Sequence, residues 1–349
     1  MDMTESELQA FHEHLHENNF QGQWEKHESD SKEPRLEPHR WEWDDIVASL
    51  NRSKDYISLD DMGPGSRRAL VLDNPAEGID LRGPCWTMLT AVQMVIPGEV
   101  ARAHRHNFEA FRFIVQGNDS VVTNVNGEKL PARTGDLLLT PRMAWHDHIN
   151  NSSEDVIWID GLNTPFITDA LHDMHFEEFQ SDRQSASHES GYFESQFGTM
   201  QPVAETPTDD TPPYRFPWES ARQSLEMAVT EDNHYDPHNG YFLEYVNPRT
   251  GQGPVLQTIS LRLQLLQSGE ETQSHRHNNT EIFHVVSGSG ESTIGGKTYT
   301  WEEGDFFVVP PMRWHDHSVT SSDDVILFNI TDSPIFDAFN LRRTESKDA

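Results

Sequence analysis

The chain has 349 residues, of which 58 are acidic and 26 are basic, so its formal net charge is −32. This charge argues against nucleic acid as a partner, and no apolar run approaches the roughly 18–20 residues that cross a bilayer. A single cysteine excludes both an intrachain disulfide and a thiolate metal cluster. These features predict a soluble, cytoplasmic protein that binds neither nucleic acid nor membrane.

The acidic residues are spread along the whole chain, which suggests a halophilic protein. At about 1 M salt the Debye length falls to roughly 3 Å, so the repulsion between like charges is screened. We therefore expect the free energy of unfolding to be higher in 2 M KCl than in 0.1 M KCl. Denaturant titrations at the two concentrations check this, and a midpoint that does not rise with salt would favour the alternative, an ordinary acidic protein.

Residues 1–65 are predicted to form a hydrophilic, helical N-terminal arm. Its pair of tryptophans, Trp41 and Trp43, is expected to pack on the rest of the chain or on a partner subunit. The run His12-Glu13-His14-Leu15-His16 matches the HExxH motif of zinc proteases. Since no apolar face or third ligand accompanies it, we interpret it as the solvated side of a helix.

Residues 66–168 are rich in short runs of Val, Ile, Phe and Leu, separated by turn residues such as Asn126-Gly127. Side chains alternate along a strand, so His104 and His106 point to one face. A third histidine, His146, follows in a later predicted strand. Three neutral imidazoles that leave other coordination positions of the metal open suit Fe(II), Mn, Ni, Cu or Zn, and Fe(II) is favoured for O2 chemistry. The alternative is that the histidines merely fill the mouth of a barrel.

Residues 169–235 are expected to be a polar, partly helical linker with a helix near PWESARQSLEMAV (217–229). Residues 236–337 then repeat the first strand-rich region: VQMVIPGEVARAHRHNFEAFRFIVQG (92–117) matches LQLLQSGEETQSHRHNNTEIFHVVSG (263–288), and GDLLLTPRMAWHDH (135–148) matches GDFFVVPPMRWHDH (304–317). Two blocks in the same order indicate two copies of one domain. Residues 338–349 are predicted to be a tail.

In the second copy, His-x-His, Glu281 and Gly288 have the spacing of the first motif of the cupin superfamily, which this copy resembles. The first copy carries Ala110 where Glu281 is expected. In that departure the chain resembles the gentisate 1,2-dioxygenase family. The resemblance extends to the runs RRALVLDNPA (67–76), HRHNFEAFRF, WHDH, PYRFPWESAR and YVNPRTGQGPVLQT. The resemblance implies an all-β fold of two cupin (double-stranded β-helix, or jelly-roll) barrels and a homotetramer.

Members of this family are extradiol-type enzymes that use Fe(II) to insert both atoms of O2 into gentisate (2,5-dihydroxybenzoate), cleaving C1–C2 to give maleylpyruvate. The resemblance implies one Fe(II) in the first cupin. It would be held by His104, His106 and His146. The substrate residues implied are Arg68 and Arg112 for the carboxylate, His148 for the phenolic oxygen and acid–base chemistry, Asp160 to orient its neighbours, and Gln93 to line the pocket.

The two copies differ where the substrate would bind. Arg112 and Asp160 of the first copy become Phe283 and Asn329 in the second. A metal with three neutral ligands keeps its full charge of +2, which matches a chelate that carries a carboxylate and a phenolate, and a guanidinium can hold the carboxylate. The first copy is therefore the catalytic candidate.

The second copy has a complete ligand set that can hold a second metal, which we expect to be structural or a relic: His275, His277, Glu281 and His315.

Two alternatives to gentisate cleavage stay open. Leu89 stands where relatives often carry a tryptophan, which would leave room for salicylate or 1-hydroxy-2-naphthoate as substrate. A bicupin that only binds a small molecule is the other alternative.

Overall fold

The structure, a computed structural model, describes residues 4–25, 35–59, 67–197, 214–231, 234–248 and 251–347. The chain divides into two compact units, Met1–Arg35 and Leu36–Ala349. The first unit therefore ends at residue 35, whereas the predicted arm extended to residue 65. No helix among the described residues has the length and hydropathy needed to cross a bilayer.

The N-terminal unit contains helix α1 (Glu5–Glu17), which begins at a capping box formed by Thr4 and Glu7. The turn after the helix folds back on it. Trp24 donates its indole N–H to His12 Nε2 at 3.0 Å, and its ring stacks on Phe11. Because His12 is engaged in this way, the HExxH run is part of a small helical hook, as its interpretation as a helix face requires.

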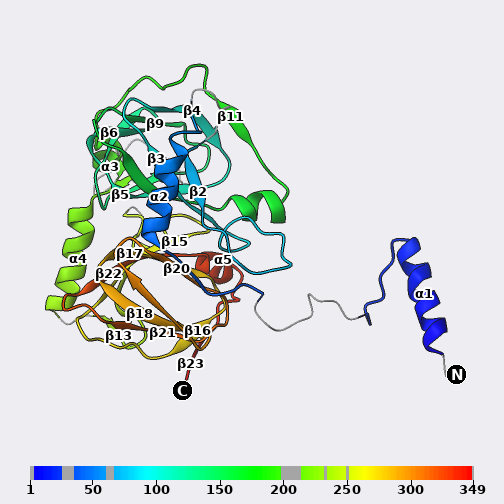
Figure 1. The fold of residues 1–349 in the computed structure, drawn as a ribbon. Helices are drawn as coiled ribbons and strands as arrows, with labels where there is room; N and C mark the ends of the chain where they lie inside the picture. Colours follow the sequence, from blue (N-terminus) through cyan, green and yellow to red (C-terminus); the bar gives the residue numbers. More distant parts are fainter. Residues whose placement is uncertain are drawn as a thin grey trace. The chain divides into compact units, whose positions relative to one another are not determined.

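The second unit consists of two strand-rich barrels, one above the other in Figure 1. The strands of the first barrel are β2 (Ala69–Val71), β3 (Leu89–Val95), β4 (Val100–His106), β5 (Ala110–Gln116), β6 (Asn118–Val125), β7 (Glu128–Ala132), β8 (Leu137–Thr140), β9 (His146–Asn150) and β10 (Val156–Leu162). Those of the second are β13 (Tyr235–Asp236), β14 (Gly240–Glu244), β15 (Ser260–Leu266), β16 (His275–His277), β17 (Glu281–Ser287), β18 (Ser289–Ile294), β19 (Lys297–Glu302), β20 (Phe306–Val309), β21 (His315–Val319) and β22 (Val325–Thr331).

Each barrel is built from two facing antiparallel sheets. In the first, the sheet β12-β8-β5-β10-β3-β2 faces the sheet β11-β4-β9-β6-β7, with β12 (Arg215–Phe216) and β11 (Phe176–Glu178) added as edge strands. In the second, the sheet β1-β20-β17-β22-β15-β14-β13 faces the sheet β19-β18-β21-β16-β23, with β1 (His39–Trp41) and β23 (Thr344–Ser346) at the edges. The predicted turn at Asn126-Gly127 is confirmed, since it joins β6 to β7, and Gly295-Gly296 joins β18 to β19 in the same way, all four residues with positive φ. The all-β fold and the duplication are thus confirmed.

Alternation along the strands separates three apolar cores. One face of β5 and β10 lines the first barrel with Ile114 and Trp158, and the same faces of the second barrel carry Phe283 and Val285. The opposite faces of both barrels meet in a central cluster, where Phe113 and Phe328 stack with ring centroids 4.1 Å apart. The two barrels therefore share a core and form one unit.

The segment before each barrel begins on the other barrel. Strand β1 (His39–Trp41) precedes the first barrel but pairs with β20 of the second, and β12 (Arg215–Phe216) precedes the second barrel but pairs with β8 of the first. The helices that follow, α2 (Trp43–Ser53) and α4 (Trp218–Thr230), then return: α2 contacts β2 and β3, and α4 contacts β14 and β15. Figure 1 shows α4 along the side of both barrels. Residues 214–231 of the predicted linker thus form an exchanged arm.

Each exchanged arm is fixed by the same three contacts. The backbone N–H of Trp43 donates to Asp305 Oδ1 at 2.8 Å, and the backbone N–H of Trp218 donates to Asp136 Oδ1 at 3.0 Å. The tryptophan rings lie directly against Gly304 and Gly135, where an added Cβ would stand 2.4 Å from the indole Cγ. An arginine in each arm completes the set by pairing with the same aspartate.

Replacing Gly304 by alanine is expected to lower the free energy of unfolding by about 3 kcal/mol. Its φ of +94° costs an alanine about 1–2 kcal/mol, and displacing the Trp43 ring costs about 1–3 kcal/mol more. The matched control is Gly296→Ala, where φ is +86° and nothing lies within 4 Å of the new Cβ. Urea denaturation of both variants measures the difference; equal losses would mean that the Trp43 contact contributes nothing.

Two of the remaining segments extend a sheet of each barrel. The π-helical turn Phe166–Ala170, β11 (Phe176–Glu178) and α3 (Tyr192–Phe197) follow the first barrel, and α5 (Ser333–Ala338) and β23 (Thr344–Ser346) follow the second. Strand β11 pairs with β4, and β23 pairs with β16 in the corresponding place. The predicted tail at 338–349 therefore contains a strand of the second barrel.

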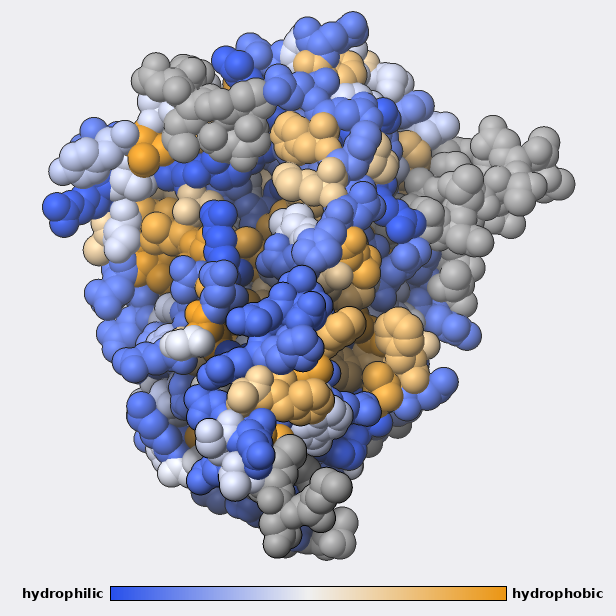
Figure 2. All heavy atoms as spheres, turned by 90° about the vertical axis from the view of Figure 1, so that its right-hand side faces the viewer, coloured by the Kyte–Doolittle hydropathy of each residue, from blue (hydrophilic) through white to orange (hydrophobic). Residues whose placement is uncertain are grey.

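Figure 2 shows one face of the molecule, on which hydrophilic side chains predominate and apolar side chains form several separate groups. The exposed large apolar residues are spread over the chain, from Phe11 and Tyr56 to Phe339 and Leu341.

Candidate active site

Three histidines of the first barrel converge on one point. His104 and His106 lie on β4 and His146 lies on β9, and the two strands pair so that His104 is opposite His146. Ligand nitrogens of all three lie within 4.8 Å of one another, and all three side chains are buried. The structure thus brings together the three residues that the sequence singled out.

Backbone hydrogen bonds orient these three imidazoles. Each Nδ1 is within hydrogen-bond distance of a main-chain carbonyl close in sequence, which accepts its proton and leaves Nε2 as the atom that can bind a metal. The bonds are His104 to Arg102 at 2.9 Å, His106 to Phe108 at 2.8 Å and His146 to Ala144 at 2.9 Å. His146 Nε2 is buried without any hydrogen-bond partner. This tautomer is the one that a metal ion requires.

Burial keeps these imidazoles uncharged. Desolvation lowers the pKa of His104 to about 2 and the pKa of His106 to about 3, and it holds the pKa of His146 well below its ordinary value. The positive charge of the nearby Arg67 acts in the same direction on His104 and His106. The three nitrogens are therefore neutral donors across the physiological pH range.

A buried ion pair lies beside the histidines. Arg112 on β5 and Asp160 on β10 are direct cross-strand neighbours, with Arg112 Nε 3.1 Å from Asp160 Oδ1. Thr140 accepts a hydrogen bond from Arg112 Nη1, and the Trp158 indole donates to Asp160 Oδ2. Burial raises the pKa of Asp160, and the neighbouring Arg112 opposes that rise. The pair places a fixed guanidinium inside the barrel.

Two further predicted residues present unpartnered polar atoms. Thr123 Oγ1 lies 2.9 Å from His148 Nδ1, while His148 Nε2 is buried without a partner. Burial and the charge of Arg112 hold the pKa of His148 well below its ordinary value. Neither polar atom of the Gln93 side chain has a partner, although this residue is completely buried. Buried polar groups without partners indicate a place where a ligand binds.

Arg68, expected to grip the substrate carboxylate, lies elsewhere. Its guanidinium donates to Glu99 Oε2 and to the Ile57 carbonyl, each at 2.6 Å. The neighbouring Arg67 instead reaches the site, where its Nη2 lies 3.3 Å from His104 Nε2 and can donate to it. The physical reason is strand alternation: Ala69 pairs with Gln93, so Arg67 shares the inner face with Gln93 and Arg68 has the outer face.

The second barrel repeats the histidine geometry with different neighbours. Ligand nitrogens of His275, His277 and His315 lie within 4.8 Å of one another. Glu281 lies beside this group, with Oε2 3.4 Å from His277 Nε2, and its other oxygen is 3.6 Å from Arg262 Nη1. A cavity of about 350 Å³ is lined by His275, His277, Glu281 and Arg262.

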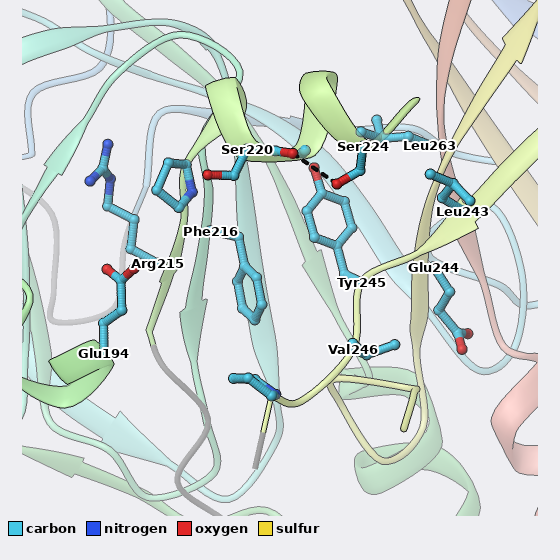
Figure 3. Close-up of a pocket in the computed structure, with 13 residues that line it drawn as sticks. Glu194, Arg215, Phe216, Ser220, Ser224, Leu243, Glu244, Tyr245, Val246 and Leu263 are labelled. Atoms are coloured by element: carbon cyan, nitrogen blue, oxygen red, sulfur yellow. Dashed lines mark hydrogen bonds between the residues drawn. The ribbon is translucent and has the colours of Figure 1, made fainter. Parts of the chain in front are cut away.

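A separate cavity, of about 400 Å³, lies between the exchanged arm and the second barrel. Figure 3 shows the Tyr245 ring beside Phe216, with its hydroxyl directed toward α4 between Ser220 and Ser224. None of the described residues that line it is a histidine, and apolar side chains such as Leu243 and Leu263 form much of its wall. This cavity is therefore distinct from both histidine groups.

Comparison with known proteins identifies the family. Residues 91–161 and 262–331 each match the Cupin domain family. The chain is 38% identical to a gentisate 1,2-dioxygenase from Haloferax sp., over 93% of both chains, and 34% identical to a 5-aminosalicylate 1,2-dioxygenase from Comamonas sp., over 99% of this chain and 92% of that one. The chain belongs to the gentisate 1,2-dioxygenase family.

The structural comparison agrees with this membership. The crystal structure of salicylate 1,2-dioxygenase from Pseudoaminobacter salicylatoxidans with gentisate has a TM-score of 0.88 and 29% identity to this chain, covering 100% of this chain and 96% of that one. Because the match covers nearly all of both chains, it includes both barrels.

Two residues at the site escaped sequence reasoning. Arg67 is adjacent to the predicted Arg68, and pairing β2 with β3 would have identified it. Nothing in the sequence of the first copy alone indicates Thr123, the partner of His148. The second copy, however, carries Ser292 at the matching place, 2.7 Å from His317 Nδ1. A hydroxyl facing the second histidine of each WHDH segment is thus a shared feature of the two barrels.

Proposed function

We propose that the chain is an Fe(II)-dependent dioxygenase that inserts both atoms of O2 into gentisate and cleaves C1–C2 to give maleylpyruvate. One observation carries the proposal: three neutral, buried histidines converge beside two guanidinium groups, Arg67 and Arg112, that face the same interior. This is a site for a metal and an aromatic acid together.

The donor set fits a divalent iron ion. His104, His106 and His146 offer three uncharged nitrogens, and the unpartnered Nε2 of His146 needs a partner in the folded protein. When bound, Fe(II) supplies open coordination positions and the one-electron chemistry that a spin-paired organic substrate needs to react with O2. Three neutral ligands leave the charge of the ion intact, so an anionic substrate is favoured.

The side chains around the histidines select the substrate. Arg67 and Arg112 carry two positive charges against the one negative charge of Asp160, and this excess favours a carboxylate. Asp160 holds Arg112 in place from the adjacent strand. His148 Nε2 is available to exchange a hydrogen bond with an ortho-hydroxyl group of the substrate, and Thr123 fixes the ring.

A second candidate substrate is favoured by the wall that β3 forms. Leu89, Ala91 and Gln93 alternate onto the inner face of this strand, and Leu89 stands where relatives often carry a larger tryptophan. A larger ring such as 1-hydroxy-2-naphthoate would fit against this wall, and salicylate would use the same polar contacts. Gentisate ranks first because its 5-hydroxyl group makes the ring electron-rich. The relative that acts on 5-aminosalicylate also takes an electron-rich ring.

Labelled oxygen tests the proposal. Protein loaded with Fe(II) without air is mixed with gentisate and then with ¹⁸O2, and mass spectrometry is expected to find two labelled atoms in the ring-opened product. One labelled atom or none contradicts dioxygenation. Parallel reactions with salicylate and 1-hydroxy-2-naphthoate rank the substrates, and iron-loaded protein that binds all three acids without consuming O2 would point to the non-enzymatic alternative.

A further inference from the structure

A buried carboxylate ties the first metal site to the second barrel. Glu109 is only 8% exposed and lies three residues after His106. Its carboxylate accepts hydrogen bonds from Gln257 N at 3.1 Å, Thr258 N at 3.3 Å and Thr258 Oγ1 at 3.1 Å. Gln257 and Thr258 belong to the loop that enters β15 of the second barrel. All three donors therefore come from the other barrel.

Phe108, the residue before Glu109, contacts the metal ligand His106 directly. Phe108 accepts the Nδ1 hydrogen bond of His106 at 2.8 Å, and its ring stacks on the imidazole with centroids 3.7 Å apart and an angle of 9°. Asn163 closes the arrangement: it accepts from Glu109 N at 2.8 Å and donates to Thr258 Oγ1 at 2.9 Å. The position of His106 thus depends on Phe108, and that of Phe108 on the anchor at Glu109.

The duplication repeats this link in the opposite direction. Thr87, in the loop that enters β3, matches Thr258 and donates to Asp332 Oδ2 at 2.5 Å, while the other oxygen of Asp332 accepts from Thr280 N at 2.8 Å. Thr280 follows His277, whose Nδ1 bonds to the Asn279 carbonyl. Each barrel therefore anchors the histidine loop of the other.

We propose that Glu109 and Thr258 are positioning residues, through which the second barrel fixes the metal ligand His106 of the first. The inference rests on the proposed metal site of the first barrel and gives the second barrel a role there without any contact to substrate. Partners that orient a ligand from outside the ligand set typically change metal affinity about 10- to 100-fold when they are removed.

Cobalt(II) titration tests the proposal without substrate. All variants carry His275→Ala and His277→Ala, which leave only His315 and Glu281 of the second ligand set. The Co(II) dissociation constant and visible spectrum of the full chain are measured. Glu109→Gln is expected to raise the dissociation constant about tenfold and to alter the ligand-field bands. Thr258→Val, which removes one donor, should raise it by less, and Thr258→Ser should restore the starting value.

The matched control is Asp332→Asn, which weakens the reciprocal link and is expected to leave the dissociation constant of the first site within about twofold. A folded Glu109→Gln or Thr258→Val variant with unchanged affinity and spectrum would overturn the proposal, as would an equal effect of Asp332→Asn. The titration uses no substrate, so its outcome does not depend on ring cleavage. A chain that cleaves no aromatic acid would refute the proposed function, whereas the positioning role of Glu109 and Thr258 would still be decided by the Co(II) affinities.

Discussion

Replacing His106 by alanine is expected to abolish ring cleavage, whereas His277→Ala should leave activity within about threefold of the parent chain. The two residues occupy the same place in the two barrels, and both belong to a group of three histidines. Only the first group faces an Arg112–Asp160 pair and Arg67. Loss of a metal ligand costs more than the roughly 10- to 100-fold typical of residues that merely orient one.

The pair of variants is its own control for folding, because both remove an equally buried imidazole from a β-strand. Iron content and steady-state kcat/KM with gentisate are measured on protein loaded in the same way. Equal losses of activity would overturn the assignment of catalysis to the first barrel. Full activity of His106→Ala would remove the metal site itself from the proposed chemistry.

The duplicated fold and the histidine groups were predictable because both signals are local. An HxH run on a strand places two imidazoles on one face whatever the rest of the fold does, and the repeat supplied the third histidine in each copy. The glycine- and asparagine-containing turns were equally local, since positive φ at two successive residues selects a tight hairpin.

The misplaced arginine shows where such reasoning ends. Arg67 and Arg68 are adjacent, so opposite faces of one strand decide which of them enters the barrel, and only the pairing of Ala69 with Gln93 fixes that choice. Since β2 is three residues long, it has too little alternation of its own to reveal its inner face. A one-residue shift in register exchanges the two roles completely.

The exchanged arms were missed for a different reason. The repeat extends upstream of the barrels, where PHRWEW (38–43) matches PYRFPW (213–218), and this signal was present in the sequence. What the sequence does not contain is the partner: β1 pairs with β20, which lies more than 260 residues later. A segment that precedes one barrel but packs on the other can be placed only when both barrels are seen together.

The charges of the two barrels explain why one fold carries two different sites. In the first, Arg67 and Arg112 outweigh Asp160, so a bound divalent ion would leave an excess of positive charge for an anionic substrate. In the second, Glu281 contacts both His277 and Arg262, so the carboxylate neutralises the site from within. Each barrel thus carries its charges at positions that are uncharged in the other: Arg112 and Asp160 correspond to Phe283 and Asn329, and Glu281 corresponds to Ala110.

The Arg112–Asp160 pair can be separated into its structural and functional parts. Arg112→Met and Asp160→Asn are each expected to lower the free energy of unfolding by about 3–5 kcal/mol, because each leaves a buried partner uncompensated. The double variant should recover most of that loss. The second barrel already folds with an uncharged pair at these positions, Phe283 and Asn329, which are cross-strand neighbours.

Recovered stability should not restore turnover. A hydrogen-bonded guanidinium contributes about 1.5–3 kcal/mol to holding a carboxylate, so the double variant is expected to lose about 10- to 100-fold in kcat/KM, mainly through KM. Urea denaturation and steady-state kinetics on the three variants separate the two effects. A double variant that is both stable and as active as the parent chain would show that the pair only supports the barrel, and that the substrate carboxylate is held by Arg67 without it.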